Sequence, residues 1–336
     1  MKQLVGLTYD LRDDYLSAGL EIHQVAEFDS AQTLDAIEQA IISLGYRTDR
    51  IGNGPALARR LVDGDRWDMV FNIAEGLAGR SRESQVPCLL EMFNQPYTFS
   101  DPLTCAATLD KAVAKRLVRS AGLATPDFAI VRSASDIARV NLTFPLFAKP
   151  LAEGTGKGID TQSRIESPSQ LREICNRLLE VYDQPVLVEQ YLPGREFTVA
   201  IIGWGNESTV LGSLEIVLNS PAHKSIYSYD AKERCEELVT YKPPGDSVRA
   251  PVERLALEAY IALDCRDAGR VDIRCDRSGA PSFMELNPLP GMHPTHSDLP
   301  MIATQQGLAY QQLIAAILDS AFARSSRQGK STKLMT

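Results

Sequence analysis

The fold of this chain is indicated most clearly by a hairpin near its C-terminus, residues 270–288, which read RVDIRCDRSGAPSFMELNP. The letters DRSG at 276–279 are a turn signal between two apolar, strand-like runs. Residues two apart on a strand face the same way. We therefore expect two carboxylates and one carboxamide to converge on one face of the hairpin, from Asp272, Glu285 and Asn287.

Three oxygen donors of this kind predict a metal site. Mg²⁺ usually takes one or two carboxylates together with substrate phosphates. Zn²⁺ prefers His and Cys and is not indicated, whereas Mn²⁺ is an alternative to Mg²⁺. Acids at the ends of a hairpin are more often simply solvated, so the hairpin alone leaves both interpretations open.

Composition bounds the class of protein. A chain of 336 residues is longer than a single hydrophobic core usually serves, so we expect two or three domains with a cleft between them. The net charge of -8 argues against a nucleic-acid partner, although a local basic channel for phosphates is compatible with it. Six cysteines without CxxC spacing indicate free thiols. With no signal sequence or membrane-spanning run visible, we expect a cytoplasmic protein that acts on small molecules.

Strands and helices alternate in the first hundred residues, which predicts a parallel α/β layer. Strands are expected at 4–8 and 68–72, and helices at 33–44 and 101–122. The predicted segments are an N-terminal α/β domain at 1–100, a central lobe at 101–192, a C-terminal lobe with the hairpin at 193–322, and a disordered polar tail at 323–336.

A glycine-rich loop follows an apolar strand that ends in Lys149, and residues 149–158 read KPLAEGTGKG. Glycines permit positive φ, so successive N–H groups can point into one concavity, while the lysine adds a charge for phosphate oxygens. The Walker A order and the Rossmann order are both absent. A tight turn or mobile hairpin is the alternative interpretation.

A third segment, residues 186–197, reads VLVEQYLPGREF and joins an apolar strand to a turn flanked by Glu189 and Glu196. Such a strand can present backbone groups to a purine edge. Ionised carboxylates can accept hydrogen bonds from an adenine amino group and from ribose hydroxyls. An ordinary strand-turn-strand with exposed glutamates is the alternative.

In their order along the chain, these motifs resemble the ATP-grasp ligases, and within them the D-alanine–D-alanine ligase group. The resemblance covers residues 68–318. It rests on LDK at 109–111 with Lys115, KP at 149–150 with the glycine loop, VE at 188–189 with GRE at 194–196, DAK at 230–232, GRVD at 269–272, and MELNPLPG at 284–291. It implies a multidomain α/β and α+β fold in which two ATP-grasp lobes hold ATP, after a parallel α/β domain on the side of the first substrate.

The resemblance also implies a role for each polar residue of these motifs. Arg270 would stabilise developing negative charge, and Lys232 would reach the γ-phosphate from a mobile loop. The catalytic group would consist of Arg270, Lys232, Thr155 and Ser297. The nucleotide would be bound by Lys111, Lys149, Glu153, Gly154, Gly156, Glu189, Tyr191, Leu192 and Glu196. Two Mg²⁺ ions would be held by Asp272, Glu285 and Asn287.

The implied chemistry is phosphoryl transfer from ATP to a carboxylate, which gives an acyl phosphate that an amine then attacks to form an amide. Such a site needs charge neutralisation and the exclusion of water by closing loops. The segment 225–242 is a plausible lid, and a homodimer is usual in the group. The alternatives are a non-catalytic ATP-binding regulator, and a ligase or carboxylase that acts on a carboxylate other than an amino acid.

The chain departs from this group on the substrate side. The group's N-terminal S-x-E-R-E-x-S-like stretch, whose glutamate anchors the first substrate's ammonium, is not found, and residues 8–14 occupy its place. The group's HGxxGEDG-like segment reads AEGLAGRSRE at 74–83, with glutamate where histidine is usual. We expect a first-substrate cluster there, since guanidinium groups pair with carboxylates and glutamates with ammonium. Its members would be Glu75, Arg80, Arg82 and Glu83. A solvated helix start is the alternative.

The chain also differs from the group at Thr155, which stands where the group has a loop serine, and in segment 291–297, which is one residue longer before its serine. On the expected lid, Glu233 follows the lysine in place of an aromatic residue, although Tyr227 and Tyr229 are close in sequence. His293 and His296 precede Ser297 and are candidates for the second substrate, with a surface position as the alternative. We therefore expect the ATP half of the family site to be kept and the acyl donor to be different.

Overall fold

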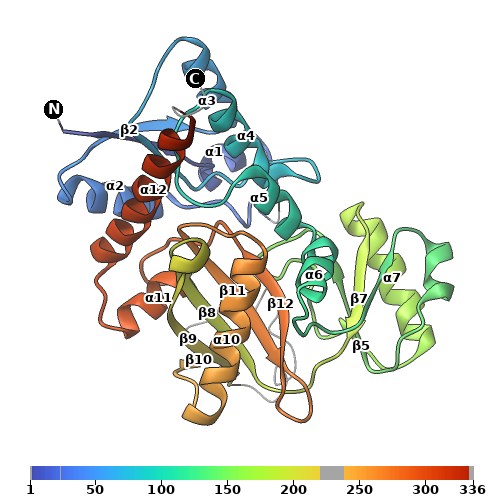
Figure 1. Cartoon of the computed structure of the whole chain (residues 1–336). Helices are drawn as coiled ribbons and strands as arrows, with labels where there is room; N and C mark the ends of the chain where they lie inside the picture. Colours follow the sequence, from blue (N-terminus) through green and yellow to red (C-terminus); the bar gives the residue numbers. More distant parts are fainter. Residues whose placement is uncertain (1, 23, 220–237, 333–336) are drawn as a thin grey trace.

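A computed structural model describes residues 2–22, 24–219 and 238–332 (Figure 1). The N-terminal part holds a three-stranded sheet in the order β2-β1-β3, and both outer strands pair with β1 in parallel. Its strands are β1 (Leu4–Thr8), β2 (Arg47–Gly52) and β3 (Met69–Asn72). Its helices are α1 (Arg12–Ser17), α2 (Ala31–Ser43), α3 (Gly54–Val62), η1 (Arg82–Ser84) and α4 (Gln85–Met92). The predicted parallel α/β layer is confirmed.

The two remaining sheets are antiparallel and follow in sequence. The central sheet has the order β4-β7-β5-β6, and the C-terminal sheet the order β10-β9-β8-β11-β12. The central elements are β4 (Phe128–Val131), η2 (Ala134–Arg139), β5 (Leu146–Pro150), β6 (Arg164–Ile165), α7 (Pro168–Tyr182) and β7 (Val186–Gln190). The C-terminal elements are β8 (Glu196–Ile202), η3 (Gly205–Glu207), β9 (Thr209–Leu218), β10 (Val239–Lys242), α10 (Asp246–Ala262), β11 (Ala268–Cys275), β12 (Pro281–Asn287), α11 (Asp298–Gln305) and α12 (Tyr310–Thr332).

The helix expected at 101–122 is in fact two helices, α5 (Pro102–Leu109) and α6 (Lys111–Ser120). The break falls at Asp110, whose backbone is extended and whose carboxylate accepts hydrogen bonds from the backbone N–H groups of Ala112 and Val113. An aspartate that caps a new helix in this way ends the one before it. Lys111 therefore stands at the first position of α6, where the change of direction brings it to the glycine loop.

The prediction of a disordered tail at 323–336 is wrong for 323–332, because α12 continues to Thr332, while 333–336 lie outside the described residues. The helix is anchored by the buried side chain of Arg324, which pairs with Asp267 at 2.6 Å. Leu313, Ile317 and other residues of α12 complete the core of the N-terminal sheet, so the chain's two ends share one core (Figure 1). Among the described residues, no helix is both long and apolar enough to cross a bilayer.

Candidate active site

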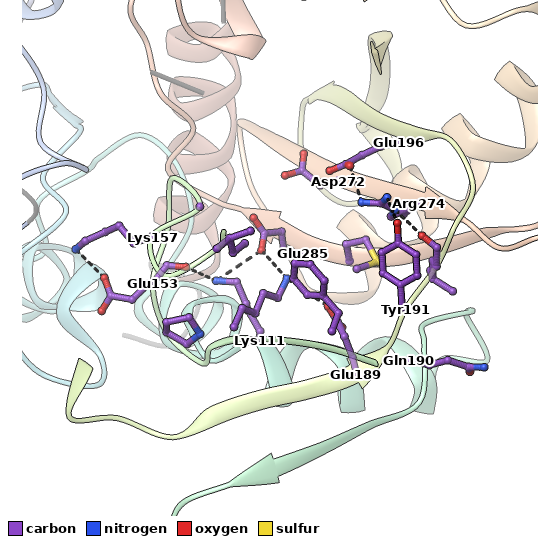
Figure 2. A pocket seen from close by; sticks show the side chains of 17 residues that line it. Lys111, Glu153, Lys157, Glu189, Gln190, Tyr191, Glu196, Asp272, Arg274 and Glu285 are labelled. Atoms are coloured by element: carbon purple, nitrogen blue, oxygen red, sulfur yellow. Dashed lines mark hydrogen bonds and ion pairs between the residues drawn. The ribbon is translucent and has the colours of Figure 1, made fainter. Parts of the chain in front are cut away.

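A pocket lies between the central sheet and the C-terminal sheet, and we call it the inter-sheet pocket (Figure 2). One wall carries Lys149 of β5 and Glu189 of β7, and the other carries Asp272 of β11 and Glu285 of β12. It encloses about 780 Å³, open solvent included. The structure brings all the predicted nucleotide-binding residues except Gly154 to this pocket, namely Lys111, Lys149, Glu153, Gly156, Glu189, Tyr191, Leu192 and Glu196.

A chain of buried ion pairs crosses the floor of the inter-sheet pocket. Lys149 Nζ lies 3.5 Å from a carboxylate oxygen of Glu189 and 3.5 Å from one of Glu285, while Lys111 Nζ lies 3.6 Å from Glu285. Lys115, which was not predicted as a site residue, lies 2.8 Å from Glu189, and neither side chain is exposed. Three lysines thus face two glutamates, and the surplus positive charge suits a polyphosphate.

Burial and pairing together set the pKa values of the residues in these ion pairs. Burial acts to lower the pKa of Lys149, but Glu189 and Glu285 outweigh it and hold that pKa above its usual value. Burial acts to raise the pKa of Glu189, but Lys115 and Lys149 hold it below its usual value. Both partners are therefore charged at neutral pH, as electrostatic stabilisation of phosphate requires.

Arg274 organises the far end of the inter-sheet pocket, and sequence reasoning missed it. Its guanidinium donates to the carbonyl of Leu192 at 2.7 Å and to Glu196 at 2.9 Å, and it lies 5.3 Å from the ring centroid of Tyr191. The signal was available, because Arg274 is two residues beyond Asp272 and so faces the same side of β11. Figure 2 shows this group on the side of the pocket away from Lys157.

The hairpin has the predicted geometry. Asp272 pairs directly with Glu285 across β11 and β12, and Arg270 pairs with Asn287, so the four side chains share one face. The carboxylate of Asp272 accepts from Arg270 at 3.0 Å, and Glu285 contacts the two lysines of the pocket floor. The side chain of Arg270 is only 13% exposed and is held charged by Asp272 and by Asp298 at 3.0 Å.

The donor set on this face fits Mg²⁺. It offers two carboxylates and a carboxamide, all hard oxygen ligands, and leaves other positions to phosphate and water. No group of three or more His, Cys, Asp or Glu side chains suited to a metal occurs among the described residues, so an all-protein cage is not built there. A site completed by substrate oxygens is what this arrangement can hold.

The glycine loop separates two pockets. Glu153, Gly156 and Lys157 line the inter-sheet pocket, whereas Gly154 and Thr155 line a second pocket on the other side. Thr155 has a φ of 50°, a left-handed conformation that is uncommon for a residue other than glycine. Its hydroxyl oxygen is buried and has no hydrogen-bond partner among the described residues, and it is therefore available to a ligand.

We call the second pocket the acidic pocket. It encloses about 1490 Å³, open solvent included. Its acidic lining consists of Glu27, Asp29, Glu75, Glu83 and Asp298. Arg270 and Asn287 of the hairpin also line it, while Asp272 and Glu285 line the inter-sheet pocket. The hairpin and the glycine loop thus stand between both pockets, and a group transferred from one pocket to the other would pass beside Arg270.

The predicted first-substrate cluster is only partly brought together. Glu75 and Glu83 line the acidic pocket. Arg82 is not among the lining residues and donates to Glu27, which lines the pocket, at 2.7 Å and to the carbonyl of Ala152 at 2.9 Å. Arg80 is not in the cluster, because its side chain is 75% exposed and pairs with Asp110 at 2.6 Å. Arg82 thus contacts the glycine loop through the carbonyl of Ala152.

Of residues 8–14, which stand where the group has its glutamate stretch, only Arg12 lines the acidic pocket. Glu27 and Asp29 line it, immediately before α2, and they were missed. Glu27 accepts from the backbone N–H of Gly154 at 2.6 Å and so fixes the loop. The available signal was the pattern Glu-x-Asp-Ser at 27–30, in which Ser30 caps the helix.

The carboxyl group of Asp29 should make the stability of the protein depend on pH, and this can be tested. Burial raises its pKa from 3.8 to about 7, with Asp10 adding to the effect and Arg12 and Thr33 opposing it. The unfolded chain then ionises at lower pH than the folded protein, so the free energy of unfolding falls between about pH 4 and pH 7. Asp29→Asn removes this contribution. When the pH is raised from 5.5 to 8, we expect wild type to lose at least about 1 kcal/mol more of its free energy of unfolding than the variant does.

Urea unfolding at both pH values measures that difference. Asp183→Asn, at an exposed position, is the matched control and is expected to leave the pH dependence unchanged. An Asp29→Asn variant with the pH dependence of wild type would contradict the assignment of a protonated Asp29.

The acceptor side of the acidic pocket is formed by the loop before α11. The hydroxyl of Ser297 accepts from the backbone N–H of His293 at 2.9 Å, and the rings of His293 and His296 lie 4.6 Å apart. All three line the pocket. Asp298 pairs with Arg270 at 3.0 Å, a contact that sequence reasoning did not anticipate. Lys232, Glu233, Tyr227 and Tyr229 lie outside the described residues.

With this geometry in place, the chain was compared with known proteins. A family model described as "D-ala D-ala ligase C-terminus" matches residues 117–319. A D-alanine–D-alanine ligase of Xanthomonas axonopodis pv. citri is 35% identical over 288 residues, covering 83% of this chain and 86% of that protein. The chain belongs to the D-alanine–D-alanine ligase family. It is accordingly an ADP-forming ligase of the ATP-grasp class, which confirms the family and activity predicted from the motifs.

Other comparisons show similarity in sequence and in fold. An uncharacterised protein, y4sG, of Sinorhizobium fredii is 37% identical over 264 residues, covering 76% of this chain and 75% of that protein. Two solved structures have the same fold with a TM-score of 0.73 each. They are a D-alanine–D-alanine ligase from Bacillus anthracis complexed with ATP, at 21% identity over 97% of this chain and 99% of that one, and the VanG D-Ala:D-Ser ligase from Enterococcus faecalis, at 20% over 96% and 100%.

Proposed function

We propose that this ligase uses ATP to activate the carboxylate of an amino acid or a related small acid and joins it to the amino group of a second amino acid. The observation that carries the proposal is the position of the hairpin and the glycine loop between the inter-sheet pocket, whose floor carries Lys111 and Lys149, and the acidic pocket. A nucleotide in the inter-sheet pocket would then present its terminal phosphate to a substrate carboxylate bound in the acidic pocket. Relatives named D-alanine–D-alanine ligase support a dipeptide product.

Each step of the reaction has residues to serve it. A carboxylate oxygen of the first substrate attacks the γ-phosphorus, ADP leaves, and Lys111 and Lys149 neutralise the transferred charge. The amine then attacks the acyl carbon, inorganic phosphate leaves, and the amine's proton passes to solvent or phosphate. Arg270 is held charged at the boundary of the two pockets, where it can stabilise the oxyanion.

The remaining polar groups position the substrates. Thr155 offers its buried hydroxyl to the first substrate, and Ser297 stands at the acceptor end. Because Glu27 is occupied by Arg82 and Gly154, we assign the first substrate's ammonium to Glu75 and Glu83. Tyr191, Leu192 and other residues of the far end would hold the base and ribose. That the enzyme works as a cytoplasmic homodimer is part of the proposal and rests on the family resemblance.

Mg²⁺ bound by Asp272, Glu285 and Asn287 would neutralise phosphate charge. Chelation with EDTA is expected to abolish ADP release, with Mg²⁺ restoring it and Mn²⁺ as a possible substitute. Glu285→Gln is expected to raise the Mg²⁺ concentration for half-maximal rate at least about tenfold. Glu258→Gln, exposed on α10, is the control. An unchanged Mg²⁺ dependence in Glu285→Gln would contradict the metal assignment.

The proposed function is tested by measuring ADP release across a panel of D- and L-amino acids and small carboxylates, offered singly and in pairs, with mass spectrometry of the products. We expect at least one pair to stimulate ADP release and to yield an amide. If no pair or small acid stimulates turnover, the proposal fails.

A further inference from the structure

The acidic pocket holds more carboxylates than its cations satisfy. Glu27 is paired with Arg82, and Arg270 is shared by Asp272 and Asp298. Glu75 and Glu83, in contrast, make no side-chain hydrogen bond or ion pair within the described ranges 2–22, 24–219 and 238–332. Two carboxylates of the pocket wall therefore have no cation of the chain itself bound to them.

Glu83 is the more informative of the two, because only 9% of its surface is exposed while it lines the pocket. Burial, with a contribution from Glu27, raises its pKa to about 7 in spite of Arg82 and Lys111. Burial and the neighbouring Glu83 raise the pKa of Glu75. Glu83 is buried and Glu75 is partly buried. Ionised carboxyl groups at such positions are costly without a counter-ion, and the arrangement is typical of a site where the ligand brings the charge.

The position of these groups limits what the ligand is. Both carboxylates face the same pocket as Thr155 and Arg270, so the ligand is the substrate whose carboxylate is activated beside the glycine loop. An α-ammonium group neutralises one of the two carboxylates. With a neutral side chain, the other carboxyl group would have no cation and would have to keep its proton, whereas a second ammonium group would pair with its ionised form.

We propose that the first substrate is a diamino monocarboxylic acid, whose two ammonium groups are bound by Glu75 and Glu83. This inference rests on the proposed function and narrows it to a class of substrate. It also accounts for the sequence departure at 74–83, where glutamate stands in place of the group's usual histidine.

The experiment compares amino acids that differ in side-chain charge, ornithine against norvaline and 2,3-diaminopropionate against alanine, each as the D and L form. ADP release is measured with ATP, Mg²⁺ and a constant excess of one acceptor, and the product mass identifies the activated acid. We expect kcat/KM to be at least about tenfold higher for the diamino acid of the preferred pair, since hydrogen bonds between charged groups contribute that much.

Variants locate the preference. Glu83→Gln and Glu75→Gln are each expected to reduce the ratio of the two kcat/KM values at least about fivefold, and Glu75→His serves as a second probe of the same position. Glu173→Gln, exposed on α7 and remote from the pocket, should keep the wild-type ratio. A thermal shift on ATP addition, retained in every variant, shows that each one folds.

The outcomes are distinguishable. A kcat/KM that is higher for the neutral acid of each pair, or equal for both acids, overturns the inference and leaves the proposed function standing. A preference that persists unchanged in both glutamine variants also overturns it. ADP release that no amino acid stimulates overturns the proposed function, and the inference with it.

Discussion

Lys149→Ala is expected to lower kcat for ATP-dependent ligation at least about a hundredfold, the cost typical of removing one preorganised electrostatic contact. Lys149 is nearly buried and lies between Glu189 and Glu285 at 3.5 Å from each. Its loss would leave Glu285 with Lys111 alone on the pocket floor, and a polyphosphate would meet a wall with one positive charge fewer. Because charge builds up during phosphoryl transfer, kcat should fall more than the affinity for ATP.

Steady-state ADP release with saturating amino acids gives kcat, and fluorescence titration with an ATP analogue gives the affinity. Lys2→Ala, at an exposed position far from the pocket, is the matched control and should retain wild-type turnover. A melting temperature measured for both variants separates loss of folding from loss of chemistry. Turnover of Lys149→Ala within about tenfold of wild type would exclude a role in transition-state stabilisation.

Local periodicity was sufficient to predict the hairpin. Alternation on a strand fixes which side chains share a face, so Asp272, Glu285 and Asn287 could be placed together before any long-range contact was known. The same alternation places Arg274, two residues after Asp272, on that face as well. The family motifs then supplied the fold class and the ligase activity, which the comparisons confirm.

Contacts between distant segments could not be predicted. Glu27 reaches Gly154 across 127 positions, and Lys115 reaches Glu189 only because Asp110 redirects the chain between α5 and α6. Nothing in the local pattern distinguishes Arg82, which is buried against Glu27, from Arg80, which is solvated. Burial and pairing of this kind are properties of the tertiary structure.

A buried ion pair between Arg324 and Asp267 lies next to the strand that carries Arg270. Its removal is expected to have the largest effect on stability. Arg324 of α12 donates to Asp267 at 2.6 Å and to the carbonyl of Tyr97 at 2.8 Å, while Asp267 also accepts from the backbone N–H of Phe99 at 2.9 Å. Asp267 immediately precedes β11, three residues before Arg270. The pair thus joins the C-terminal helix, the end of the N-terminal domain and the strand that carries the oxyanion-stabilising arginine.

Arg324→Met is expected to lower the free energy of unfolding by about 3–5 kcal/mol, because it leaves the carboxylate of Asp267 buried without its cation. Urea unfolding measures this loss. Arg327→Met, one turn along the same helix, removes a pair with Glu207 in which both side chains are more than half exposed, and it should change stability by no more than about 0.5 kcal/mol.

The double variant Asp267→Asn with Arg324→Met distinguishes the two costs. If the unpaired charge accounts for most of the loss, removing the carboxylate as well should restore part of the stability, since the remaining asparagine can still accept from Phe99. A loss below about 1 kcal/mol in Arg324→Met would show that α12 is held by its apolar contacts alone. The position of β11, and with it that of Arg270, would then depend on the shared core of the N-terminal sheet and not on this ion pair.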